Sequence, residues 1–104
     1  MNIKPDRQEL LMSLQRALLG EVHPLLRQAS IEADSTLKVV RIKFEYAQGD
    51  AFETAVECCR RASSEVAADF LSTWQLDEQH VRTSNSGLAP LMLIAYKRYE
   101  PNSN

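Results

Sequence analysis

The chain is poor in the residues that bind metals or form disulfides. Its two cysteines are adjacent, at Cys58 and Cys59, and its two histidines are His23 and His80. Successive side chains on a helix point about 100° apart, so the two thiols are badly placed to pair with each other. No cysteine pair at zinc-ligand spacing accompanies the histidines. We therefore predict no disulfide, no metal site and no cofactor.

Long apolar runs and an excess of basic charge are also missing. The longest apolar run near the carboxyl end, residues 88–96, is far too short to span a bilayer, and residues 1–6 lack the apolar segment of a signal peptide. The net charge is −2, whereas nucleic-acid-binding domains usually present a basic face. We expect a cytoplasmic protein that does not contact membranes and for which nucleic acid is an unlikely partner.

Hydrophobic residues make up 44% of the 104 residues, enough for one core. The sequence predicts a single domain over 1–104, with 101–104 as a frayed tail. Apolar residues recur at helical spacing over 5–19 and again over 52–70. Pro5 suits the first turn of the earlier helix, and Gly20 supplies the left-handed residue that commonly ends one.

Four segments predict strands, at 25–34, 37–46, 74–83 and 91–99. The clearest alternation is in the second, where Val40, Ile42, Phe44 and Tyr46 share one face. The third is weaker, and the change of parity between its apolar residues, Leu76 and Val81, suggests a bulge or a late start. The α-β-β-α-β-β order predicts an α+β fold, a two-layer sandwich with two helices on one face of a mostly antiparallel four-stranded sheet.

Between residues 53 and 78, six carboxylates are accompanied by only two basic side chains. This pattern has two interpretations: a solvated helix face followed by a polar loop, or an acidic patch that docks a basic partner. Under the second interpretation, the predicted partner-binding residues are Glu65, Asp69, Asp77 and Glu78.

A second candidate surface is apolar. Leu37 and Val39 would lie on the outer face of the second strand, and Leu91 and Leu93 on the same side of the fourth. Two helices covering only one face would leave these four residues partly exposed as an interface, unless loops or a shifted register cover them.

Two further features have weaker functional interpretations. Arg41 and Lys43 lie on the polar face of the second strand and would be the core of a nucleic-acid surface. Cys58 precedes two arginines, which leaves its reactivity open. No nucleophile, base and orienting group can be assembled from the sequence, so we predict no catalytic residues and no enzyme.

Two blocks resemble small bacterial immunity proteins of secreted toxin systems, including contact-dependent growth inhibition. The first is Ala17-Leu18-Leu19-Gly20-Glu21-Val22-x-Pro24-x-Leu26-Arg27 and the second is Glu65-Val66-Ala67-Ala68-Asp69-Phe70. Proteins of this group are similar in length and share the α-β-β-α-β-β order. The resemblance implies a protein that binds and neutralises a cognate toxin domain by occluding or distorting its site, and it transfers no catalytic or contact residue.

The leading hypothesis is therefore a non-enzymatic immunity protein, and its acidic surface would suit a nuclease toxin with a positive substrate channel. One alternative is a homo-oligomeric structural or regulatory domain, such as a homodimer that uses the apolar surface. Another is a small nucleic-acid-binding domain.

Overall fold

The computed structural model describes residues 5–70, 74–83 and 87–100.

Helix α1 (Arg7–Leu18) begins at a capping box, not at the predicted proline. The Asp6 carboxylate accepts the Glu9 N–H at 2.8 Å, and the Glu9 carboxylate accepts the Asp6 N–H at 3.0 Å. These two bonds satisfy N–H groups that have no partner inside the helix, so Pro5 lies before the helix. Gly20 has a φ of 80° just after the helix, as predicted.

Helix α2 (Phe52–Phe70) matches the segment that its periodicity predicts. Its buried residues recur every three or four positions and form one face, which comprises Ala55, Val56, Cys59, Ala62, Ser63 and Val66. The α-β-β-α-β-β order of elements is also confirmed.

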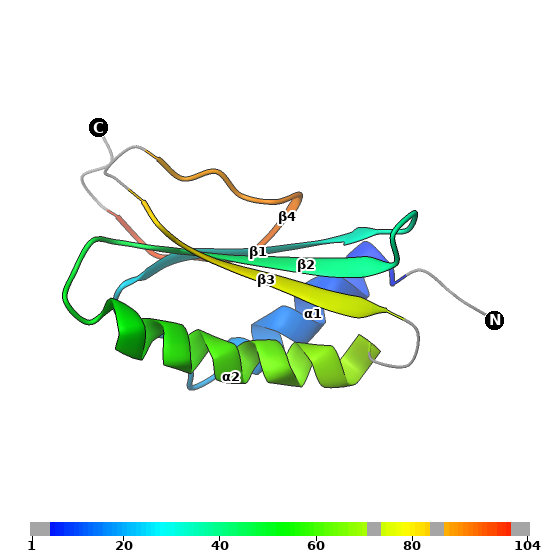
Figure 1. Cartoon of the computed structure of the whole chain (residues 1–104), viewed down its shortest axis with the longest axis horizontal. Helices are drawn as coiled ribbons and strands as arrows, with labels where there is room; N and C mark the ends of the chain where they lie inside the picture. Colours follow the sequence, from blue (N-terminus) through cyan, green and yellow to red (C-terminus); the bar gives the residue numbers. More distant parts are fainter. Residues whose placement is uncertain (1–4, 71–73, 84–86, 101–104) are drawn as a thin grey trace.

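The four strands form one sheet in the order β3-β2-β1-β4 (Figure 1). Strand β1 (Leu26–Asp34) forms an antiparallel hairpin with β2 (Val39–Tyr46), and it pairs antiparallel with β4 (Leu93–Lys97) along its other side. Strand β3 (Gln75–Arg82) pairs with β2. The two edge strands are therefore β3 and β4.

Two of the three strand pairings are antiparallel and the third is parallel, so the sheet is mostly antiparallel, as predicted, but mixed. β2 and β3 run parallel, and helix α2 connects them. A helical crossover returns the chain to the end of the sheet at which the preceding strand began, so the next strand must run in the same direction.

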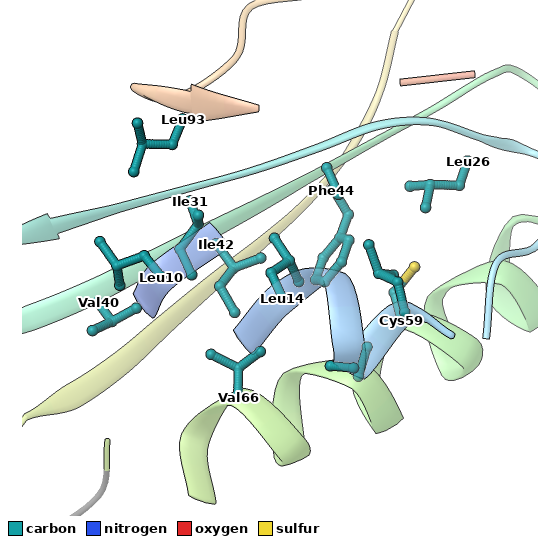
Figure 2. Packing of buried hydrophobic residues seen from close by; sticks show 14 of the residues in the cluster. Leu10, Leu14, Leu26, Ile31, Val40, Ile42, Phe44, Cys59, Val66 and Leu93 are labelled. Atoms are coloured by element: carbon teal, nitrogen blue, oxygen red, sulfur yellow. The ribbon is translucent and has the colours of Figure 1, made fainter. Parts of the chain in front are cut away.

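A single hydrophobic core lies between the sheet and the two helices. Val40, Ile42 and Phe44 are fully buried on β2, as their alternation predicts. Figure 2 shows these side chains together with Leu14 of α1 and Val66 of α2. In Figure 1 both helices lie below the sheet as drawn, with α1 packed on β1 and β4 and α2 packed on β2 and β3.

No bulge interrupts β3, contrary to the prediction from its sequence. β3 stays in register with β2 over all eight of its residues. Leu76 and Val81 differ in parity because they point to opposite faces of a regular strand; Leu76 is half-buried and Val81 is exposed. The irregularities lie elsewhere, in the pairing of β1 with its two neighbours.

The face of the sheet opposite the helices is covered in part by residues 87–92. Because β3 and β4 lie at opposite edges, the chain between them must cross β2 and β1. In Figure 1 this orange stretch runs above the sheet. Its backbone forms hydrogen bonds with side chains of β1 and β2. The Ala89 N–H donates to the Glu45 carboxylate, and the Leu91 N–H donates to the Ser30 hydroxyl. The Lys43 ammonium donates to the Ala89 carbonyl. The last strand is consequently shorter than the predicted 91–99.

Candidate partner-binding surfaces

Two of the four predicted acidic residues, Glu65 and Asp69, lie on α2 and are exposed. Asp69 accepts a hydrogen bond from the Ser13 hydroxyl at 2.5 Å, and its carboxylate is 3.6 Å from the Arg16 guanidinium. Glu65 precedes Asp69 by four residues and therefore lies on the same side of the helix. Asp69 borders the junction of α2 with α1, and Glu65 lies one turn before it on α2.

A groove of about 290 Å³ opens at this junction of the two helices. It combines apolar and charged side chains, and its lining residues are Glu9, Met12, Ser13, Arg16, Asp69 and Phe70. Met12, which lines the groove, is 50% exposed. Sequence reasoning missed the groove, because the α1 residues that line it carry no signal for a site. We refer to it below as the helix groove.

The other two acidic residues, Asp77 and Glu78, are adjacent on β3 and point to opposite faces of the sheet. Asp77 is in register with Arg41 on the face away from the helices, and Glu78 is in register with Ile42 on the helix side. The structure therefore does not bring the four carboxylates into one patch. Because side chains alternate between the two faces of a strand, the sequence alone already separated Asp77 from Glu78.

Glu78 ends a chain of side-chain contacts that reaches into the core. Its carboxylate lies 2.6 Å from His80 Nε2, and His80 Nδ1 lies 2.7 Å from the Tyr46 hydroxyl. His80 also stacks on the Phe44 ring, with centroids 5.1 Å apart. Burial raises the pKa of the Tyr46 hydroxyl well above its usual value, so this group stays protonated. These contacts hold the helix-side side chains of β3 in fixed positions.

The two cysteines differ in environment. Burial raises the pKa of Cys59 to about 11, so its thiol stays protonated at neutral pH and acts as a small hydrophobic residue. Cys58 is half-buried, and its sulfur lies 3.6 Å from an Arg61 nitrogen.

The structure disperses the four residues of the predicted apolar surface. Leu37 is 63% exposed in the turn before β2, and Val39 is half-buried. Leu91 is half-buried, and Leu93 is buried in the core because its register with Ile31 turns it to the helix side. Leu93 therefore lies on the opposite face from Val39. The exposed apolar residues of this region that sequence reasoning missed are Met92 and Ile94.

Arg41 and Lys43, the residues of the alternative nucleic-acid surface, are engaged within the chain. Arg41 forms ion pairs with Glu32 at 3.3 Å and with Asp34 at 3.2 Å. The hydrogen bond from the Leu37 N–H, and to a lesser extent the hydrogen bond from Arg41, holds the pKa of Asp34 below its usual value. Lys43 donates to the Ala89 carbonyl at 2.6 Å. Both cations therefore have partners that phosphates would have to displace.

Within residues 5–70, 74–83 and 87–100, no group of three histidine, cysteine or carboxylate side chains is arranged to hold a metal ion. His23 accepts the Leu25 N–H through Nδ1 at 3.1 Å and so closes the turn before β1. Over the same described segments, neither helix is long and apolar enough to cross a membrane.

Comparison with known proteins gives one finding about the family. A search of curated protein sequences finds no significant match. A family model described as MafI2 immunity protein matches residues 7–100, which span every helix and strand described above. The chain belongs to the MafI2 immunity protein family.

Proposed function

We propose that this protein is a non-enzymatic inhibitor that binds a cognate toxin in the cytoplasm and blocks the toxin's activity. The observation that carries the proposal is the family match over residues 7–100. An inhibitor of this kind needs a rigid surface complementary to its partner and no catalytic group of its own. A role in contact-dependent growth inhibition stays a prediction.

The helix groove is the surface we favour for the toxin. It presents the carboxylates of Glu9 and Asp69, with Glu65 one turn away, against the single guanidinium of Arg16. A basic side chain of the toxin that entered the groove would meet more negative than positive charge, while its aliphatic stem would lie against Met12. The groove therefore offers both charge complementarity and apolar contact.

A nuclease is the class of toxin that this charge suits best. A nuclease needs a positive channel to hold phosphates, and an acidic surface placed on that channel would occupy it in place of the substrate. Long-range attraction between the two surfaces would also speed and orient their encounter. Asp77 and Glu78 are a second pair of candidate residues, on strand β3, where they point to opposite faces of the sheet.

Charge reversal of each pair separates the two surfaces. The toxin would first be identified as a stoichiometric partner of the tagged protein in its native host and then purified. We expect E65K/D69K to slow association and to weaken affinity at least tenfold, with a smaller change for D77K/E78K. Association rates are measured by biolayer interferometry at two salt concentrations, together with protection of growth during toxin expression.

E53K/E57K provides the matched control, because it makes the same change in net charge on exposed positions of the same helix. Thermal unfolding of each variant confirms that it is folded. If both candidate pairs bind like the control, the surface assignment is wrong. If the wild-type protein binds no toxin and protects no cell, the proposed function itself is wrong.

A further inference from the structure

The two edges of the sheet differ in how they are covered. At β4, which has only five residues, the Gln15 side chain of α1 donates to the Ala95 carbonyl at 3.4 Å. β3 has eight residues, is regular over its whole length and contains no proline. Within the described residues, no element pairs with its outer side. A long regular edge of this kind can pair with another strand.

The backbone groups that face outward on β3 can be identified from its bonds to β2. The N–H groups of Gln75 and Thr83 donate to the carbonyls of Lys38 and Tyr46, at 3.0 and 2.8 Å. Because backbone direction alternates along a strand, the odd-numbered residues face β2 and the even-numbered residues face the free edge. The outward groups thus belong to residues 76, 78, 80 and 82, which are evenly spaced for pairing.

The charges of β3 are arranged so that the strand complements itself. Its acidic residues, Asp77 and Glu78, lie in the first half, and the cation Arg82 and the hydrogen-bonding imidazole of His80 lie in the second. Antiparallel pairing with a second copy about a two-fold axis at Gln79 places Glu78 opposite His80 of that copy and diagonal to both its Arg82 and its Glu78. In this register no like charges lie directly opposite each other, and such opposition would be destabilising. Charged edge residues usually prevent pairing, but here they would select this one partner.

The side chains at this edge are already held in place before any partner arrives. Glu78 and His80 are linked to Tyr46 by the contacts described above, and the Arg82 guanidinium lies 4.5 Å from the centre of the Phe52 ring. Pairing would therefore order few side chains, which lowers its entropic cost.

We propose that β3 is a homodimerisation edge, at which two copies pair antiparallel about Gln79 to form one continuous eight-stranded sheet. The partner is a second copy of this chain, and the interface is isologous. The edge carries little apolar surface, chiefly Leu76 and Val81. The interface is consequently small, and the dimer dissociates at low protein concentration. The proposal does not depend on the toxin.

A disulfide at the symmetry axis tests both the dimer and its register. At the axis, Gln79 faces Gln79 of the second copy as a non-hydrogen-bonded pair, with Cα atoms about 4.5 Å apart, within the range a disulfide spans. We expect Gln79→Cys to cross-link rapidly under mild oxidation. Gln75→Cys is the matched control, because it is the same exposed residue type on the same face of β3 but lies opposite Thr83. Wild-type protein is oxidised in parallel to account for Cys58 and Cys59.

Complementary charge variants provide a second measurement. In a homodimer, His80→Glu places carboxylates opposite each other at Glu78, and Glu78→Arg places a second cation diagonal to Arg82. In the mixture, the introduced arginine lies opposite the introduced glutamate. We expect sedimentation velocity to show a concentration-dependent dimer for the wild type, monomers for each variant alone, and a dimer for the mixture. Recovery in the mixture would show that the single variants had folded. A wild type that stays monomeric at all concentrations, or equal cross-linking of Gln79→Cys and Gln75→Cys, would overturn the proposal.

Discussion

The two faces of the sheet are buried by different physical means. On the helix side, the fully buried side chains of β2 are apolar or aromatic and pack against two amphipathic helices. On the other side, the buried side chains are polar: Gln28, Ser30 and Glu45 are each no more than 1% exposed. They are covered partly by a segment without regular structure, and hydrogen bonds hold that segment to them.

The two faces of one sheet are therefore stabilised by different kinds of interaction. Apolar burial is roughly proportional to area and does not depend on direction. A buried hydrogen bond depends on two particular atoms, and losing one partner leaves the other unsatisfied. Neighbouring residues of β2 point to opposite faces, so Phe44 and Glu45 allow the two kinds of burial to be compared at one place in the chain.

The largest effect is expected on the helix side, from Phe44→Ala. Phe44 is fully buried and also stacks on His80, so truncation leaves a cavity that the surrounding core cannot fill. We expect a loss of about 3–5 kcal/mol in the free energy of unfolding. Urea denaturation at neutral pH measures it. A loss below about 1 kcal/mol would contradict the assignment of this face as the main core.

A smaller but still substantial effect is expected on the other face, from Glu45→Ala. The Glu45 carboxylate accepts the Ala89 N–H at 2.6 Å and the Gln28 side-chain amide at 3.0 Å, and both donors would lose their partner. We expect a loss of about 2–3 kcal/mol. Glu45→Gln keeps the shape and one acceptor and should recover part of it.

Hydrogen exchange distinguishes this loss from general destabilisation. The Ala89 amide should exchange much faster in Glu45→Ala than in Phe44→Ala when the two are compared at equal global stability. If the Ala89 amide is equally protected in both, the crossing segment is held by something other than Glu45.

The same contrast explains which parts of the fold the sequence predicted. Alternation along β2 and helical spacing along α2 are local patterns, and they identified Ile42, Phe44 and Val66 as core residues. Gln28 and Ser30 are polar residues whose burial has no local signal, because it depends on residues 87–92 crossing the sheet. That crossing follows from the strand order, which no local pattern encodes. The parallel pairing of β2 with β3 was missed for the same reason.

The candidate sites follow this division as well. The sequence identified the exposed carboxylates but could not show that Asp69 faces α1 whereas Asp77 lies beside Arg41. The helix groove and the free edge of β3 arise only when segments far apart in the chain come together. What the sequence did contain was the strand alternation that separates Asp77 from Glu78.

The smallest effect, and the one that depends most on pH, concerns the hydrogen-bonded cluster of Arg27, Thr83 and Glu100 at the end of the sheet, which we call the clasp. Arg27 is buried, and its guanidinium donates to both carboxylate oxygens of Glu100, each at 2.9 Å, and to the Thr83 hydroxyl at 2.9 Å. It thereby ties the residues that follow β4 to the end of β3. The bidentate pairing with Arg27 holds the pKa of Glu100 at about 2, below its ordinary value of 4.5.

A carboxylate whose pKa is lower in the folded state stabilises the fold above its unfolded pKa and ceases to do so as it becomes protonated. The wild type should therefore be more stable than Glu100→Gln at neutral pH, and this difference should shrink as the pH falls from about 4.5 towards about 2. Comparison of the two proteins cancels the contributions of other carboxylates, such as Asp34, that titrate in both. Urea denaturation at a series of pH values provides the measurement. A difference that stays constant down to pH 2 would mean that the clasp acts through shape and neutral hydrogen bonds and not through the charge of Glu100.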